Sequence, residues 1–370
     1  MTPVAQGWQA KAPAPQGWTE VRGCQPIKLD LSGHLRLPGL INAHDHLEFN
    51  LFPQLGRGPY PNAGEWARDI YRPDRSPIRE QLRVPKPVRL WWGALKNLLS
   101  GVTTVCHHNP YERDVFDIDF PVRVVRRFSW AHSLEFEPEL AARFRKAPAS
   151  YPFLVHCAEG ADAAARREVQ TLDGLGALDE RTAIVHGVGI TAASLALMRR
   201  RGASLVWCPT SNLAMLGRTV SRAVLRSGIP MALATDSALS APVDLLDELS
   251  VARKYLPPAR LYEMVTSGPA RILRLCRSRG DWIAVRTDAR TPAEALFDGT
   301  VALVVVAGRI RLISPDLARQ LPFQARRRFQ VLRVENRPTV LVDADVRQLR
   351  RTAAKHLGQE LRLAGKRILV

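Results

Sequence analysis

The sequence predicts an α/β fold built from parallel βα units, and three observations carry this prediction. Short apolar runs alternate with helical stretches from about residue 39 to residue 280, as in strands that are joined by helices. Several of these runs end at a histidine or an aspartate. After about residue 280 the pattern changes to short β segments. We therefore expect a large parallel domain followed by a smaller β-rich region.

Length and composition are those of a soluble enzyme. The 370 residues are 46% apolar, and a chain of this size buries a sizeable core. No apolar run approaches the roughly 20 residues that a membrane-spanning helix needs, and residues 1–26 lack the apolar segment of a signal peptide. The five cysteines form no CxxC pair, which is typical of a reducing compartment. We expect a cytoplasmic protein without a membrane partner.

The net charge of +18 is carried almost entirely by arginine, because only eight of the 53 basic residues are lysine. The arginines are dispersed, and their short clusters do not interleave with aromatic residues as a base-stacking surface would. We interpret the charge as a compositional bias. An anionic substrate and a nucleic-acid partner are the alternatives, and nucleic acid is not the expected partner.

The expected elements divide the chain into four parts. Residues 1–18 form a flexible Pro/Ala-rich arm, 19–38 a short strand-like segment, 39–280 the parallel domain, and 281–370 a β-rich region with a basic helical tail. Strands are expected in the parallel domain at 39–43, 102–106, 122–128, 151–155, 182–185, 203–208 and 229–234. Helices are expected between them at 88–99, 137–146, 161–170, 192–200 and 220–227.

Metal-binding residue types stand at the ends of these strands. His44 and His46 follow the first buried strand, and residues two apart in an extended chain point the same way. A pair of surface histidines is the alternative interpretation of that motif alone. His156, His186 and Asp236, however, each follow a further apolar strand. The carboxyl ends of parallel strands carry the active site of a βα barrel, and imidazoles with one carboxylate suit Zn²⁺ or Fe²⁺.

At this point the sequence resembles the amidohydrolase superfamily, in its mononuclear cytosine-deaminase-like and chlorohydrolase-like branch. The resemblance covers roughly residues 35–275, and its motifs follow the order of that family. They are Leu37-Pro38-Gly39-Leu40-Ile41-Asn42-Ala43-His44-Asp45-His46, Gly101-Val102-Thr103-Thr104, His156-Cys157-Ala158-Glu159, His186-Gly187, Cys208-Pro209-Thr210-Ser211-Asn212 and Thr235-Asp236-Ser237. The resemblance implies a distorted (β/α)8 TIM-type barrel with a small β-sandwich built from both chain ends.

The resemblance also implies roles for individual residues. The metal ligands would be His44, His46, His156 and Asp236, which hold one divalent ion, with zinc as the first choice and iron as the second. Glu159 would shuttle a proton from the attacking water to the leaving nitrogen. His186 would assist at the water or substrate, and Asn212 would lie near the substrate.

Elementary chemistry gives the same picture of the reaction. A divalent ion lowers the pKa of a bound water from about 15.7 towards roughly 7. Asp236 can orient that water, while Glu159 acts as general base and then as general acid. We expect a hydrolase of C–N bonds other than peptide bonds, which deaminates a small heterocyclic amine. A cyclic-amide hydrolase or ring dehalogenase is the alternative, and a basic nucleic-acid-binding protein on a relic barrel is the alternative of another class.

Two features depart from the family pattern. His107-His108-Asn109 follows the strand at 102–106, and its histidines are candidate substrate contacts or part of a polar loop. Between Val102 and His156 only one intermediate strand is evident, where the family has two, so a βα unit would be compressed or missing.

No lysine ends a strand in this interval, which disfavours a dinuclear site with a carboxylated lysine. The oligomeric state stays open, and a homo-oligomer is compatible with the sequence.

Overall fold

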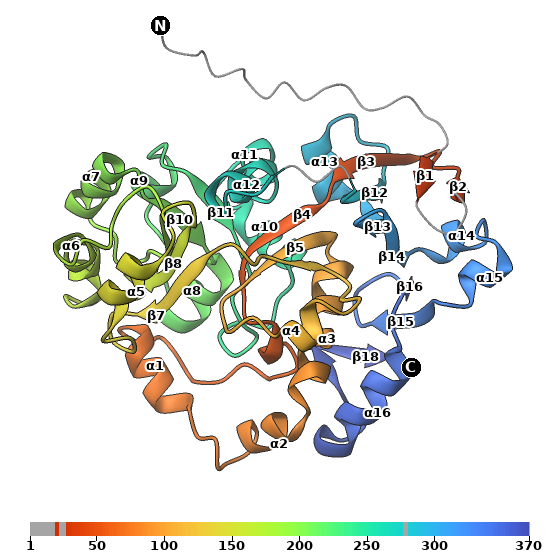
Figure 1. Ribbon diagram of the computed structural model, residues 1–370, viewed down its shortest axis with the longest axis horizontal. Coiled ribbons are helices and arrows are strands. Elements are labelled where there is room, and N and C mark those ends of the chain that lie inside the picture. The colour runs from red at the N-terminus through yellow and green to blue at the C-terminus, as the bar shows by residue number, and fades with distance from the viewer. Residues whose placement is uncertain (1–18, 22–26, 277–279, 370) are drawn as a thin grey trace, which may run out of the picture.

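The computed structural model describes residues 19–21, 27–276 and 280–369 (Figure 1). The expected arm at residues 1–18 lies outside the described residues. No helix within the described ranges combines the length and the apolar character that spanning a membrane requires.

Eight parallel strands form two sheets. The first sheet contains β4 (Leu40–Asp45), β5 (Val102–His107) and β6 (Arg123–Val124) in that order. The second has the order β11-β10-β9-β8-β7, with β7 (Ser129–Ser133), β8 (Phe153–Cys157), β9 (Thr182–His186), β10 (Ser204–Trp207) and β11 (Met231–Leu233). A parallel bridge between Asp45, the last residue of β4, and Asp236, which follows β11, joins the two sheets. The predicted parallel α/β architecture of TIM-barrel type is confirmed.

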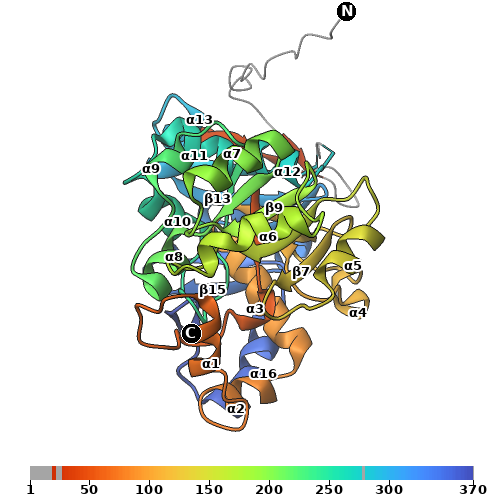
Figure 2. The same cartoon turned by 90° about the vertical axis from the view of Figure 1, so that its left-hand side faces the viewer.

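Helices cover the outer side of these sheets, and Figure 2 shows α6, α7 and α8 in front of the five-stranded sheet. Before β5 lie η1 (Leu47–Phe49), α1 (Ala63–Ile70), α2 (Ile78–Arg83) and α3 (Lys86–Leu99). Between β5 and β11 lie α4 (Arg113–Phe116), α5 (Leu140–Lys146), η2 (Ala165–Arg167), α6 (Glu168–Gly174), α7 (Ala192–Arg201), α8 (Pro209–Leu216) and α9 (Arg222–Leu225). After β11 follow α10 (Leu245–Ala252), α11 (Pro258–Met264) and α12 (Ser267–Ile272).

Local sequence signals fix the ends of several helices. The Thr191 hydroxyl accepts the Ser194 N–H at the start of α7, and Gly202 ends that helix with a φ of 75°, a conformation that glycine adopts without strain. Asp244 and Asp247 form a reciprocal capping box at the start of α10. These caps fix where the helices that follow β9 and β11 begin and where α7 ends.

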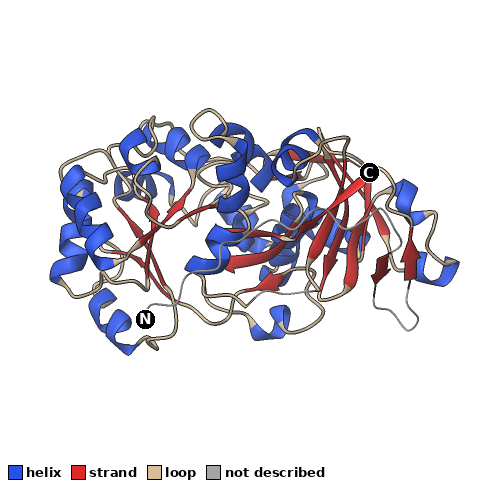
Figure 3. Cartoon of the chain, turned by 90° about the horizontal axis from the view of Figure 1, so that it is seen from above, coloured by secondary structure: helices blue, strands red, loops and turns tan. Residues whose placement is uncertain are grey.

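The segment of residues 34–38 and the C-terminal segment of residues 282–369 meet in one antiparallel sheet of eight strands, to the right in Figure 3. Its order is β17-β18-β15-β16-β14-β13-β12-β3. β3 (His34–Pro38) pairs with β12 (Trp282–Arg286), so that Leu37 lies opposite Ile283. The others are β13 (Thr300–Val306), β14 (Arg309–Ile313), β15 (Gln330–Val334), β16 (Val340–Val342), β17 (Arg362–Leu363) and β18 (Lys366–Leu369). The helices of this region are α13 (Pro292–Asp298), α14 (Pro315–Ala318), α15 (Phe323–Arg326) and α16 (Val346–Leu357). A separate two-stranded sheet consists of β1 (Thr19–Val21) and β2 (Ile27–Leu29).

The structure corrects two details of the expected element order. The run at 122–128 is not one strand, because it contributes only the two residues of β6, and a separate strand, β7, follows. Arg126 and Arg127 are exposed between them, so the charges interrupt the run. No strand is therefore missing between Val102 and His156. The basic tail is helical only in α16, since the chain closes with the β17–β18 hairpin.

Candidate metal centre and active site

The strand ends bring four metal-binding side chains together. One ligand atom each from His44, His156, His186 and Asp236 lies within 4.8 Å of the others, and all four residues are buried. His44 comes from β4, His156 from β8 and His186 from the end of β9, while Asp236 follows β11. The described residues thus contain a His/Asp metal-binding group at the carboxyl ends of the parallel strands.

His46 lies against the same carboxylate. Its Nε2 atom is 3.6 Å from Asp236 Oδ1, and His44 Nε2 is 3.3 Å from that oxygen. His44 Nε2 is also 3.2 Å from His156 Nε2, and the rings of His46 and His156 are stacked with centroids 5.7 Å apart. His44 thus contacts both His156 and Asp236, and His46 lies against the same carboxylate oxygen as His44.

The other ring nitrogen of each histidine has its own partner. Nδ1 of His46 lies 3.3 Å from Asn109 Oδ1, and Nδ1 of His156 lies 2.8 Å from the His132 carbonyl oxygen. Because both partners are acceptors, each Nδ1 donates, and the Nε2 lone pair is left free for a metal. His44 Nδ1 is 3.1 Å from His108 Nδ1, whose Nε2 faces the Ala131 carbonyl at 3.1 Å.

The charge states of these groups suit a cation. Burial lowers the pKa of His44 to about 4 and that of His156 well below its usual value, so both imidazoles are neutral near pH 7. Burial alone would raise the pKa of Asp236, but the adjacent imidazoles of His44 and His186 hold it well below the ordinary range. Neutral imidazoles beside an ionised carboxylate are the donor set that zinc and iron take in proteins.

Asp236 is held on its second oxygen. Ser211 and Ser240 donate hydrogen bonds to Oδ2 at 2.7 and 2.6 Å, which leaves Oδ1 for the histidine side. The residue has a φ of 58°, a left-handed conformation that is uncommon outside glycine. The backbone here turns sharply to aim the carboxylate at the cluster.

Glu159 lies beside this cluster rather than at the start of the following helix. Its Oε1 is 3.3 Å from His186 Nε2, while His186 Nδ1 lies 2.9 Å from Asn212 Oδ1. Burial, followed by the charges of Asp236 and Glu168, raises the pKa of Glu159 well above the usual value. A carboxyl group with a raised pKa can hold a proton at neutral pH, as a general acid and base must.

A cavity of about 680 Å³ opens over these groups. Its floor carries His46, His156, Glu159, His186 and Asp236. Its walls are mostly apolar and aromatic and come from η1, α1, α2 and the loops after β7 and β11. Apolar walls around a few convergent polar groups are typical of a small-molecule site.

The predicted substrate contacts lie behind the floor. His107, His108 and Asn212 are 1%, 0% and 0% exposed, and none of them lines the cavity. His108 contacts His44, Asn212 contacts His186, and His107 Nε2 lies 3.2 Å from Glu48 Oε2. Their positions suit the orientation of cluster residues rather than contact with a ligand in the cavity.

Several residues of the site carry no clear signal in the sequence. His132 and Glu168 line the cavity, and Glu168 Oε2 accepts the Ala158 N–H at 2.5 Å. His132 lies in β7, whose few apolar residues hide it as a strand. Asp45, between His44 and His46, forms a fully buried ion pair with Lys96 of α3 at 2.8 Å. The one signal that could have pointed to His132 is its position near the end of β7, and that strand was not recognised.

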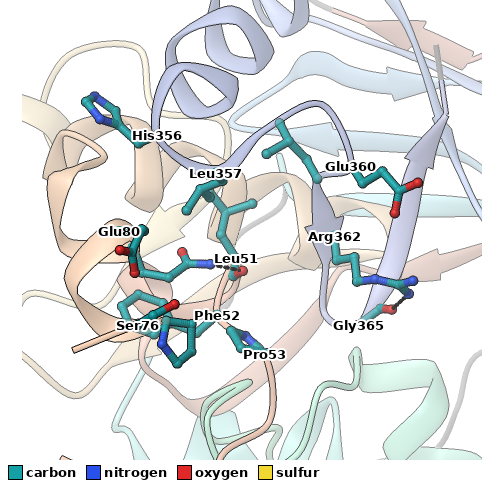
Figure 4. A pocket seen from close by; sticks show the side chains of 13 residues that line it. Leu51, Phe52, Pro53, Ser76, Glu80, His356, Leu357, Glu360, Arg362 and Gly365 are labelled. Atoms are coloured by element: carbon teal, nitrogen blue, oxygen red, sulfur yellow. Dashed lines mark hydrogen bonds between the residues drawn. The ribbon is translucent and has the colours of Figure 1, made fainter. Parts of the chain in front are cut away.

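A second cavity, of about 280 Å³, lies away from the metal-binding group (Figure 4). It is lined by residues 51–53, by residues 76, 77, 80 and 81, and by side chains of the C-terminal segment between His356 and Gly365. Phe52 lines both cavities. None of the metal-binding side chains reaches the smaller one, so the larger cavity is the candidate active site.

Comparison with known proteins finds similar sequences and folds. Residues 146–311 match the model of the amidohydrolase family. The chain is 26% identical over 320 residues to the 5-methylthioadenosine/S-adenosylhomocysteine deaminase of Pyrococcus furiosus. The alignment covers 69% of this chain and 74% of that protein. It is 28% identical over 303 residues to the enzyme of the same name from Halobacterium salinarum, over 66% and 70% of the two chains.

Solved structures share the fold. A zinc-bound adenosine deaminase from Xanthomonas campestris superimposes with a TM-score of 0.61 at 19% identity, over 89% of this chain and 92% of that one. A zinc-bound atrazine chlorohydrolase from Arthrobacter aurescens does so with a TM-score of 0.64 at 16% identity, over 88% of each chain. The resemblance to the amidohydrolase superfamily that the sequence motifs carry is confirmed by the family-model match and by these relatives.

Proposed function

We propose that this enzyme hydrolytically deaminates an amino-substituted heterocycle, with an adenine nucleoside as the first candidate. The observation that carries the proposal is the convergence of three imidazole Nε2 atoms and the Asp236 carboxylate beside Glu159, at the floor of an apolar cavity. The curated relatives, which are named as deaminases of adenosine thioethers, support this choice of substrate.

One divalent ion would be held by His44, His46, His156 and Asp236, with zinc preferred and iron second. Zinc in the related adenosine deaminase and chlorohydrolase structures supports this preference. A ligand atom of His186 lies within 4.8 Å of those of His44, His156 and Asp236, but His186 Nε2 faces Glu159 at 3.3 Å. We assign it to the substrate side rather than to the ion. A bound cation supplies a water of lowered pKa and polarises the group under attack.

The side chains then divide the proton transfers. Glu159 accepts a proton from the attacking water at Oε1 and later delivers it to the leaving nitrogen, which departs as ammonia. His186, whose Nδ1 donates to Asn212, keeps Nε2 turned towards Glu159 and the reacting atoms. Asp236, fixed by two serine hydroxyls, orients the water. The apolar walls exclude bulk water and strengthen these interactions.

Alternatives of the same family differ only in the leaving group. A cyclic-amide hydrolase or ring dehalogenase would use the same floor, and the likeness to the chlorohydrolase extends to the fold alone. A relic barrel that binds nucleic acid would have no reason to keep Glu159 and the whole ligand set. Ammonia release from 5′-methylthioadenosine, adenosine, cytosine and a chlorotriazine, by the zinc-loaded enzyme, separates these alternatives. Chloride release without ammonia would contradict the proposal.

The finer architecture and the cellular setting are also proposals. We propose that the eight parallel strands of residues 39–280 make a distorted (β/α)8 barrel, and that 19–38 and 281–370 form a separate small β-sandwich-type domain. The free cysteines Cys106, Cys157, Cys208 and Cys276 agree with a reducing compartment, the cytoplasm.

A further inference from the structure

The metal-binding side chains straddle the seam between the two parallel sheets, which consists of residues 42–45 and 234–236. His44 belongs to β4 and His46 directly follows it, whereas Asp236 follows β11 of the other sheet. In the described part of the chain no strand ladder joins β4 to β11. The backbones meet through the bridge between Asp45 and Asp236 and through the Asp236 N–H, which donates to the His44 carbonyl at 3.2 Å. The spacing of the metal-binding side chains therefore depends on how firmly this seam is held.

A buried cation lies at the seam. Lys96 of α3 is 2% exposed. Its Nζ atom is 2.8 Å from Asp45 Oδ2 and donates to Thr235 Oγ1 at 3.0 Å. Asp45 stands between the two histidines that end the first sheet, and Thr235 directly precedes Asp236. One ammonium group thus contacts both sides of the seam, each time at the neighbour of a metal-binding residue.

Amide side chains reinforce the contact across the seam. Asn42 Nδ2 donates to Thr235 Oγ1 at 2.9 Å, and Asn42 Oδ1 accepts the Thr235 N–H at 3.3 Å. The Asp45 carboxylate accepts hydrogen bonds from Asn97 Nδ2 at 2.7 Å and from Asn50 Nδ2 at 3.0 Å. All of these residues are buried. Because hydrogen bonds are strong in a buried network, the network holds both sides of the seam in one arrangement.

Stability alone is a weak explanation of the Lys96–Asp45 ion pair. Lysine is almost never fully buried unless it is paired. Removing two charges from water costs free energy that their attraction offsets only in part, so a buried ion pair adds little to stability over apolar side chains of the same size. The position of the pair, beside the residues that would hold the metal, indicates a role in the geometry of the seam.

We propose that Lys96 is a positioning residue of the metal centre, which sets the spacing between the histidines of β4 and Asp236 by binding Asp45 and Thr235 across the seam. Lys96, Asp45 and Thr235 do not line the larger cavity, so they act through the metal-binding side chains and not on the substrate. The inference rests on the metal ligands of the proposed function, and it holds whichever heterocycle is the substrate.

Two substitutions of Thr235 separate its hydrogen bonds from its packing. Thr235→Val keeps the shape of the side chain but loses the hydroxyl that accepts from Lys96 and Asn42. Thr235→Ser keeps the hydroxyl and loses the methyl group. Competition with a chelator measures the zinc affinity of each folded variant.

We expect Thr235→Val to bind zinc about tenfold more weakly than the wild type, at the lower end of the loss that follows removal of a partner behind a metal ligand. Thr235→Ser should bind zinc as the wild type does. Wild-type affinity in Thr235→Val, or a loss in Thr235→Ser as large as that in Thr235→Val, would overturn the inference.

Removal of the cation should give the larger effect. Lys96→Met should weaken zinc binding by about 100-fold and lower the melting temperature of the metal-free enzyme, because the Asp45 carboxylate stays buried without its cation. Arg311→Met is the matched control, since Arg311 of β14 is also buried and lies 3.3 Å from Asp343. It should lower the melting temperature and leave the zinc affinity unchanged. Equal zinc losses in the two variants would contradict the inference, and if Lys96→Met does not fold, the Thr235 variants decide.

These measurements keep the inference apart from the proposed function. A wild-type enzyme that binds no divalent metal would overturn the proposed ligands together with the role of Lys96. Wild-type zinc affinity in Thr235→Val would overturn the role of Lys96 alone. The expected order of zinc affinities, without ammonia release from any heterocycle, would overturn only the deaminase proposal.

Discussion

The floor and the mouth of the active-site cavity are built on different principles. At the floor, each metal-binding side chain is buried and is held by a second hydrogen bond, such as that from His46 to Asn109. At the mouth, Tyr71, Leu82 and Phe136 stand exposed on short elements. The difference teaches that the chemical groups are held by polar partners from separate strands, whereas the opening is built from exposed apolar side chains. Substitutions at the floor should therefore have the larger effects on turnover and metal binding.

The largest effect is expected at Glu159. Glu159→Gln removes the proton carrier but keeps the shape of the side chain, so turnover should fall by about 10²–10⁴ or more while bound metal is unchanged. Steady-state ammonia release at equal zinc content measures this effect. Glu263→Gln, which removes an exposed carboxylate paired with Arg260, is the control. Turnover of Glu159→Gln within a few-fold of the wild type would show that the proton transfer is wrongly assigned.

Metal content is the next test of the floor. His44→Ala should lose most of the one equivalent of zinc or iron that we expect per chain, because His44 Nε2 lies at the centre of the cluster, 3.2 Å from His156 Nε2. Elemental analysis after gel filtration measures the loss, with His356→Ala, at the end of α16 and outside the metal-binding cluster, as the control. Two equivalents in the wild type would contradict a mononuclear site.

A finer comparison separates His46 from His186 as the ligand. Asn109→Ala removes the partner of His46 Nδ1, and Asn212→Ala removes that of His186 Nδ1. Loss of such a partner typically lowers metal affinity by about 10–100-fold. We expect this loss for Asn109→Ala, and for Asn212→Ala a fall in turnover at undiminished zinc affinity. Competition with a chelator measures both, and the reverse outcome would make His186 the fourth ligand.

The smallest effect is expected in stability. Burial raises the pKa of Glu168 to about 7, above its value in the unfolded chain, so the folded state binds this proton more tightly. The contribution of this group to the free energy of unfolding is therefore fully present at pH below about 4.5. It declines as the pH rises through about 7. Glu168→Gln, which still accepts the Ala158 N–H, should lose this decline, worth about 1–3 kcal/mol. Thermal unfolding between pH 5 and 8 measures it, and parallel curves for the variant and the wild type would count against the assignment.

The sequence predicted the parts of the molecule in which apolar runs end at polar residues. The strands before His44, His156 and His186 are regular and buried, so their periodicity located both the strands and the side chains at their ends. β7 was not predicted, because it is short and mostly polar, and His132 was missed with it. The roles of His108 and Asn212 could not be read from the sequence either, since the distance from a strand end does not say whether a side chain faces the cavity or the back of a neighbouring ring.

One segment ties the two halves of the molecule together. Residues 34–45 run almost unbroken from β3, which pairs with β12 of the antiparallel sheet, into β4, which ends at His44. Gly39 joins the strands, and a side chain there would collide with Thr103 of β5. A disturbance of the C-terminal sheet would thus pull directly on a residue of the metal-binding cluster. Metal loading should accordingly slow hydrogen exchange in β12 as well as at the cluster, so that the two halves open as a single cooperative unit.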